Sequence, residues 1–312
     1  MKPAWSVIFL TTLIGAGQGL FLAMTGVEGA VQLGVMAPVA ADFFVTGSFF
    51  ATLFLLCGLG ASFLHLGHPE RAWRAIAMWR TSWLSREVIV LPAFIAAVIA
   101  YGYGHLHGVG GTGWLAVAGV VLCIALFVCT AMIYSCLKFL QEWHTPLTLA
   151  NFIALGAASG VLSAAALAAT AWSLIVPPLT AVAALLTVTG AVTRGLSLVR
   201  NARLRPKSTA QSATGIANAK IVQKAQGAMG GSFNTREFFH GRSVAALRSV
   251  KWFFLLAVFV VPLALILLAP QQGRSQWLAL AWVVQYAGLL AERWFFFAQA
   301  RHPQNLYYQA IS

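Results

Sequence analysis

Long apolar stretches separated by short polar segments dominate this chain. A helix needs about 20 apolar residues to cross a bilayer, and only a helix or a closed barrel satisfies its own backbone hydrogen bonds there. The pattern therefore predicts an all-α integral membrane protein with eight transmembrane helices in a single polytopic membrane domain, residues 1–312. The expected spans are Trp5–Val27, Phe43–Leu64, Val88–Gly104, Trp114–Tyr134, Leu147–Thr170, Leu174–Thr193, Trp252–Ala269 and Trp277–Ala298.

The composition agrees with a membrane protein. Of the 312 residues, 60% are hydrophobic and only 9% are charged, whereas a soluble domain carries about 25% charged residues. The first apolar run, from Trp5 to Val27, is too long for the core of a typical signal peptide. We therefore expect it to be retained as the first helix.

The basic residues are distributed unevenly between the two sides of the predicted bundle. A formal net charge of +13 could suggest nucleic-acid binding, but the Lys and Arg residues lie beside apolar spans. Of these 20 residues, only Arg274 falls on the side opposite the N-terminus. The positive-inside rule then predicts that both termini are cytoplasmic, in agreement with an even number of spans.

The segment between the second and third spans is unusually rich in ionisable and aromatic groups. From His65 to Glu87 it carries four arginines, three tryptophans, two histidines and two glutamates. Ionisable groups at the rim of a membrane are costly, so they usually have a function or a partner. The arginines and tryptophans suit an interfacial loop or short helix over residues 66–87, and Arg71 and Arg74 are candidates for docking a partner protein.

Further polar residues gather where the spans reach the cytoplasmic side, with Gln18 lying deeper in the first span. On the opposite side we expect Glu28 and His105 to lie outside the spans. Reduction of a quinone takes up two electrons and two protons, and a histidine and a carboxylate can bind its carbonyls and exchange those protons. The pattern predicts a quinone site in which His65 and Glu87 are the proton-exchanging residues.

The ring of a quinone needs an apolar pocket with few polar anchors, which Trp83, Phe63 and Met132 could line. The full set of predicted quinone-binding residues is His65, Glu87, Arg86, Trp83, Tyr134, Gln18 and Glu292.

Each of these polar residues also has a purely structural interpretation, which the sequence leaves open. His65 could cap its helix, Glu87 could pair with an arginine, and Glu292 could pair with Arg293. Gln18 could form a hydrogen bond between helices, and Tyr134 could belong to the interfacial aromatic belt.

We expect neither an iron–sulfur cluster nor haem nor another metal in this chain. The four cysteines form no CxxC motif, and they are scattered in apolar segments. The seven histidines fall at span ends or in loops, where they could not ligate a haem buried between helices.

Residues 194–251 form the only sizeable segment predicted to lie outside the membrane, and it is basic. A solvated loop attracted to anionic lipid is one interpretation. Aromatic residues interleaved with arginine instead favour a docking surface for another protein. The residues concerned are Phe233, Arg236, Phe238 and Phe239.

A family resemblance rests on two motifs, His65-Leu-Gly-His-Pro-Glu-Arg-Ala and Trp79-Arg-Thr-Ser-Trp-Leu-Ser-Arg-Glu87. With the eight spans and the N-terminal Pro3–Thr12, they resemble the membrane anchor subunit of dimethyl sulfoxide reductase, one of the polysulfide-reductase-type anchors. The resemblance implies a haem-free anchor in the bacterial inner membrane that binds ubiquinone or menaquinone. It also implies that His65 and Glu87 match the histidine and glutamate implicated in quinol handling.

The resemblance further implies two partners: a four-cluster ferredoxin-like iron–sulfur subunit and a molybdenum bis-guanine-dinucleotide catalytic subunit. The loop around Gly230–Gly241 is similar to that of anchors in cytoplasmic sulfite-oxidising complexes. We therefore expect this chain to pass electrons to quinone while a partner oxidises sulfite. Quinol oxidation for a dimethyl-sulfoxide-reductase-type enzyme, a purely structural anchor and a transporter stay open as alternatives.

Overall fold

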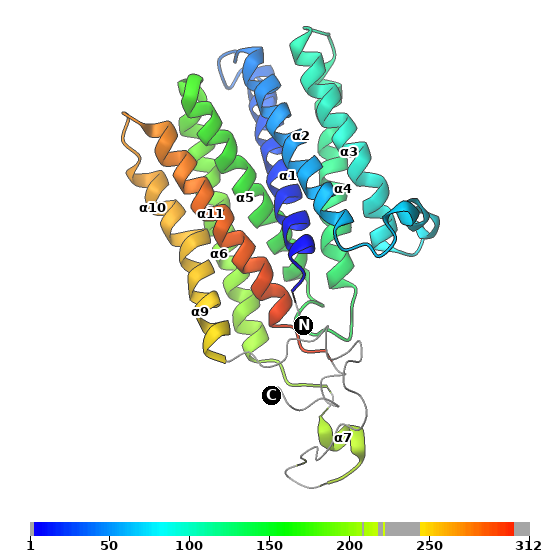
Figure 1. The fold of residues 1–312 in the computed structure, drawn as a ribbon. Helices are drawn as coiled ribbons and strands as arrows, with labels where there is room; N and C mark the ends of the chain where they lie inside the picture. The colour runs from blue at the N-terminus through cyan, green and yellow to red at the C-terminus, as the bar shows by residue number, and fades with distance from the viewer. Residues whose placement is uncertain (1–2, 208, 218–220, 222–243, 303–312) are drawn as a thin grey trace.

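The computed structural model describes residues 3–207, 209–217, 221 and 244–302, and in this part of the chain all regular structure is helical. The long helices run side by side as one bundle (Figure 1). The α-helices are α1 Trp5–Gln32, α2 Ala41–Phe63, α3 Trp83–Leu106, α4 Thr112–Ser135, α5 Pro146–Ala171, α6 Val176–Ala202, α7 Ala210–Thr214, α9 Val244–Leu255, α10 Val261–Leu268 and α11 Arg274–Ala298. The 3-10 helices η1 Pro69–Met78 and η2 Ser173–Ile175 and the π-helical turn η3 Leu256–Val260 complete the described helices.

The first and last long helices meet at one end of the bundle. α1 begins and α11 ends at this end (Figure 1), which we call the near end; the opposite one is the far end. Among the described residues, seven helical segments are long and apolar enough to cross a membrane: α1 to α5, Ser173–Ala202 and Val244–Leu268. α11 has the length but a more polar composition, so the eighth span and the cytoplasmic position of the near end stay predictions.

Several helices run further than the apolar pattern predicts, and the extensions of α6 and α1 enclose charged residues that we expected outside the spans. α6 continues past Thr193 to Ala202, so Arg194 lies inside a helix rather than at the start of a loop. α1 continues past Val27 to Gln32, so Glu28 is a buried helical residue, contrary to our expectation. In both cases another helix supplies a partner for the charged group, Glu292 of α11 for Arg194 and Thr112 of α4 for Glu28. The pattern of one segment does not reveal such partners.

The centre of the bundle is the contact between α1 and α5, which are the most deeply buried helices. Each carries a GxxxG motif, Gly15–Gly19 in α1 and Gly156–Gly160 in α5. A Cβ atom added to Gly160 would lie 2.1 Å from the backbone nitrogen of Leu20. Small residues at this spacing let two helix backbones pack directly against each other in a membrane.

The π-helical turn η3 lies between α9 and α10 and is explained by Pro262. Proline lacks the N–H group that would bond the carbonyl four residues earlier, which here belongs to Val258. Gln285 of α11 donates its Nε2 to this carbonyl at 3.3 Å and to the Thr187 hydroxyl at 3.2 Å. The side chain of one helix thus satisfies the backbone of another, as apolar surroundings require.

The α1–α5 contact gives the first prediction. Gly160→Ala should lower the free energy of unfolding by about 1–3 kcal/mol or more, because the added methyl group forces the two backbones apart. Thermal unfolding of the detergent-solubilised protein measures this loss.

Gly26→Ala, in the partner helix α1, is the matched control because its Cβ would meet no atom within 4 Å. Equal unfolding temperatures for the two variants would contradict direct backbone packing.

Candidate functional site

The start of α3 fixes the position of Glu87. Ser82 caps the helix by accepting a hydrogen bond from the Ser85 backbone at 3.3 Å. Arg86 donates its Nε to the Trp79 carbonyl at 2.9 Å and its Nη2 to the Arg80 carbonyl at 2.7 Å. These bonds tie the turn after η1 to the helix. The next residue, Glu87, points inward and is only 6% exposed.

The buried Glu87 carboxylate has a hydroxyl partner on the neighbouring helix. Thr130 of α4 donates its hydroxyl hydrogen to Glu87 Oε1. A buried carboxylate needs such donors, because its loss of hydration is otherwise uncompensated. Thr130 has a second role, since it also lines an interior cavity.

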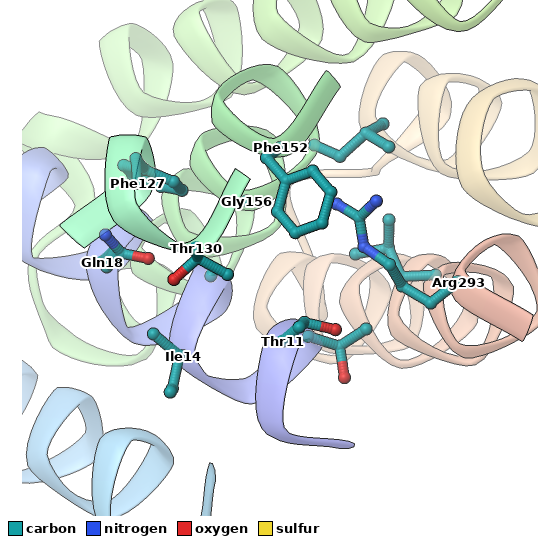
Figure 2. A pocket seen from close by; sticks show the side chains of 12 residues that line it. Thr11, Ile14, Gln18, Phe127, Thr130, Phe152, Gly156 and Arg293 are labelled. Atoms are coloured by element: carbon teal, nitrogen blue, oxygen red, sulfur yellow. The ribbon is translucent and has the colours of Figure 1, made fainter. Parts of the chain in front are cut away.

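This cavity lies among α1, α4, α5 and α11 and has a volume of about 20 Å³, enough for about one water molecule. Figure 2 shows the labelled side chains that surround it, with the Arg293 guanidinium against the Phe152 ring. The polar lining consists of Thr11, Thr12, Gln18, Thr130 and Arg293, and the rest is Ile14, Gly15, Phe127, Phe152, Leu155, Gly156 and Leu289.

Gln18 is anchored in this lining by an interhelical bond. Its Nε2 donates to the Cys123 carbonyl of α4 at 2.8 Å, and the residue is 1% exposed. The structural interpretation of Gln18 is therefore correct as far as its amide nitrogen is concerned. Because Gln18 also lines the cavity, it stays a candidate for binding a ligand or a water molecule.

Behind Arg293 lies a cluster of three buried charges. Arg194 Nε of α6 is 2.7 Å from Glu292 Oε1, and Arg293 Nη1 is 3.5 Å from Glu292 Oε2. All three side chains are almost completely buried. The guanidinium of Arg293 also lies 3.7 Å from the centroid of the Phe152 ring, a cation–π contact that offsets part of its desolvation. We call this set the ion cluster.

Tyr134 connects the two sides of the site. It lies close enough to Glu87 and Arg293 for both charges to act on it. Its ring packs in an aromatic cluster with centroid distances of 5.4 Å to Trp143 and Phe297 and 5.6 Å to Phe152 and Phe296. Tyr134 is thus a half-buried member of this aromatic cluster.

The other predicted residues lie at or near the surface of the near end. His65, just after α2, is exposed, and no hydrogen bond or ion pair joins it to Glu87 among the described residues. Phe63 is exposed, whereas Met132 is half-buried. Trp83 is half-buried beneath the Arg86 guanidinium, which lies 4.2 Å from the centroid of its ring.

The predicted docking residues are described only in part. Arg71 and Arg74 lie on η1, in which no residue is buried. Arg71 contacts Glu70 at 3.6 Å and Arg74 lies over Trp73. The candidates in the long loop, Phe233, Arg236, Phe238 and Phe239, fall outside the described residues. Both ends of the segment 194–251 are helical, since α6 reaches Ala202 and α9 begins at Val244.

Sequence reasoning does not find Thr130, Arg293 and Arg194 as parts of the site. Thr130 is one polar residue in a long apolar run and carries no local signal. The apolar pattern places Arg194 among the loop charges because it follows the last apolar residue of its span. Arg293 stands out only as a possible partner of Glu292, although it also faces the cavity.

This geometry can hold and move protons. Threonine hydroxyl groups, an amide and a guanidinium converge on space for a water molecule within the near half of the bundle, and the buried Glu87 carboxylate is joined to this lining through Thr130. These are groups that bind carbonyl or hydroxyl oxygens and exchange protons with water. Phe127, Phe152 and Leu155 supply apolar surface beside them.

Comparison with known families agrees with the architecture and with the resemblance seen in the motifs. Residues 1–308 match the family described as DMSO reductase anchor subunit (DmsC). The chain belongs to this family. The match covers the whole membrane domain. The family therefore shares the complete anchor rather than a single motif.

A curated relative of this anchor is similar over its full length. It is a sulfite dehydrogenase subunit of Allochromatium vinosum, 56% identical over 327 aligned positions that cover 100% of both chains. Together with the seven apolar helices, family membership shows a multi-pass membrane anchor subunit of an oxidoreductase complex.

The ion cluster gives the second prediction. Glu292→Gln should lower the free energy of unfolding by about 3–5 kcal/mol, because two buried guanidinium groups lose their carboxylate. Arg194→Met should cost less, since Glu292 then keeps Arg293 as a partner. Thermal unfolding of the solubilised anchor measures both changes.

Glu70→Gln serves as the control, because Glu70 is an exposed partner of Arg71 and its replacement should change stability by about 0.5 kcal/mol or less. A larger loss in Arg194→Met than in Glu292→Gln would show that the cluster is not organised around Glu292.

Proposed function

We propose that this anchor exchanges electrons between a docked iron–sulfur subunit and the membrane quinone pool, with Glu87 as the proton-exchanging residue. The observation that carries the proposal is the buried Glu87 carboxylate, bonded to Thr130 at the edge of a polar cavity. A carboxylate kept inside an apolar bundle is costly, and such residues commonly mark proton relays.

The reaction requires two protons at the two quinone carbonyls for every two electrons. When bound, the quinone supplies the redox chemistry, and the chain supplies the protons and the apolar surface. Glu87 gives a proton from its carboxyl group to a carbonyl oxygen, and it is reprotonated from the near end. His65, exposed at that end, is the proposed second proton donor, which takes its proton from water.

The cavity has a proposed part in this proton supply. Its volume suits a water molecule and is too small for a quinone ring. We therefore assign it to a water that connects Thr130 with Thr11 and Thr12, and we place the ring in contact with Glu87 outside the cavity. The ion cluster then fixes Arg293 at the cavity wall, while Gln18 and Tyr134 hold the neighbouring surfaces.

The direction of electron flow is proposed from the relative. The name of the Allochromatium vinosum protein refers to a sulfite dehydrogenase, and oxidation of sulfite releases two electrons that quinone can accept. We propose that a molybdenum-containing partner oxidises sulfite, that an iron–sulfur partner transfers the electrons, and that both dock at the near end. The near end would then lie on the cytoplasmic side of the bacterial inner membrane.

The family description favours a second direction. A DMSO reductase anchor would take electrons from quinol and pass them to a terminal reductase, and Glu87 would then accept protons rather than donate them. The same residues serve both directions. Sulfite-dependent quinone reduction and quinol-dependent sulfoxide reduction, each measured in membranes, separate the two.

The third prediction concerns Glu87. In the assembled complex, Glu87→Gln should lower sulfite-dependent quinone reduction by about 100-fold or more, because a general acid–base residue contributes about that factor. Sulfite oxidation with a water-soluble dye should be unchanged, since the dye takes electrons before they reach the anchor. Thr130→Val should give a smaller loss, of about tenfold.

Asp42→Asn is the control, because Asp42 is an exposed carboxylate at the far end of the bundle. Quinone turnover at the normal rate in Glu87→Gln would remove Glu87 from the site. Loss of both activities would instead indicate a failure of assembly, which detection of the partner subunits in purified membranes distinguishes.

A further inference from the structure

A third buried carboxylate lies at the far end of the bundle, away from the proposed quinone site. Glu28, in the last turns of α1, is 7% exposed. Its Oε1 accepts hydrogen bonds from the Thr112 hydroxyl of α4 at 2.8 Å and from Gln32 Nε2 at 3.4 Å. Glu28 thus joins two helices where they leave the membrane.

One oxygen of this carboxylate is left without a hydrogen bond. Glu28 Oε2 is buried and has no hydrogen-bond partner among the described residues. His105 and Tyr101 of α3 lie against Glu28, and His105 Nε2 is 3.7 Å from Oε1. Neither side chain makes a hydrogen bond to Oε2. A buried oxygen that lacks a donor is costly, so Glu28 Oε2 can accept a further hydrogen bond.

Glu28 also lines a groove between α1 and α4 with a volume of about 360 Å³, a size typical of sites for small molecules. Thr25, Glu28 and Gln32 provide its polar lining, and Gly26, Gly29, Gly113 and Ala116 provide room. Its apolar wall is Leu22, Val117, Val120 and Val121.

The groove opens toward the lipid. Val117 and Val121 of α4 are 56% and 61% exposed, which in an apolar span means contact with acyl chains. An occupant must therefore combine an apolar chain along these valines with a polar head at Glu28. It must also donate hydrogen bonds, because the free atom is a carboxylate oxygen.

The charged residues at the far end indicate whether the occupant's head group should be positively or negatively charged. Among the described Asp, Glu, Lys and Arg residues of this end, Glu28 and Asp42 are acidic and Arg274 is basic, and His105 and His107 are the titratable histidines there. A primary ammonium group has three N–H donors and one positive charge, so it matches an acceptor-only carboxylate better than a hydroxyl or an anionic head does. A quaternary ammonium has the charge but no donor.

We propose that the groove between α1 and α4 binds one phospholipid with a primary ammonium head group, such as phosphatidylethanolamine. Its ammonium group bonds the Glu28 carboxylate and the Gln32 side-chain carbonyl, and one acyl chain lies along Val117 and Val121. The site is independent of the proposed quinone site, which lies at the other end of the bundle.

The test uses the purified complex, depleted of lipid and titrated with phosphatidylethanolamine, phosphatidylcholine or phosphatidylglycerol of identical acyl chains. Native mass spectrometry counts the bound lipid. Phosphatidylethanolamine should bind with 1:1 stoichiometry and at least about tenfold more tightly than the other two, because one charge-assisted hydrogen bond is worth about that factor.

Two variants locate the site. Glu28→Gln should weaken this binding about tenfold, as expected for loss of the charge. Gly29→Leu should abolish it by filling the groove, and it should fold normally because a Cβ at Gly29 meets no atom within 4 Å. Gly60→Leu, an equally open position on α2, should bind lipid like the unmodified protein.

Equal binding of the three lipids, recovery of quinone in place of phospholipid, or unchanged binding in Gly29→Leu would each overturn the proposal. Because Gly29→Leu keeps Glu28 intact, a failure of Glu28→Gln to assemble leaves this test valid. The lipid-binding measurement does not require quinone turnover. Its result is therefore independent of the result obtained with the Glu87 variants.

Discussion

The close contact between α1 and α5 is the constraint on which the rest of the near-end site depends. Gly15, Gly19, Gly156 and Gly160 leave no space for side chains between the two backbones, so the register of these helices is fixed by contact rather than by interdigitation. With that register, Thr11, Thr12 and Gln18 of α1 face α4, α5 and α11 around one cavity. A bundle held apart by larger residues would not close around a space for a single water molecule.

Among the residues that the structure describes, buried charge is confined to the two ends of the bundle, and different groups balance it at each end. At the near end, Glu292 lies between Arg194 and Arg293, while Glu87 is held by Thr130. At the far end, Glu28 has hydrogen-bond donors on two helices. Between them Phe21 and Phe94 pack edge to face in an apolar core. This separation favours local proton exchange at one surface over a polar path through the whole membrane, and so weighs against a transporter.

The sequence was sufficient to predict the helices, their order and the family, because apolar length and the motifs around His65 and Glu87 are local signals. It also selected Glu87, Gln18 and Glu292 as candidate site residues, and all three are buried. It did not predict the buried positions of Arg194 and Glu28, since each continues a helix only with a partner from a distant segment. The role of Gln285 depends in the same way on Pro262, which lies on another helix. The GxxxG motifs of α1 and α5 were visible in the sequence and would have predicted their contact.

Proton exchange between Glu87 and quinone is measured most directly by redox-induced infrared difference spectroscopy of the complex. Reduction of bound quinone should produce a carboxyl signal that shifts on labelling glutamate with carbon-13 and is absent in Glu87→Gln. An identical carboxyl signal in Glu87→Gln, or a spectrum without any glutamate signal, would contradict the assignment of Glu87.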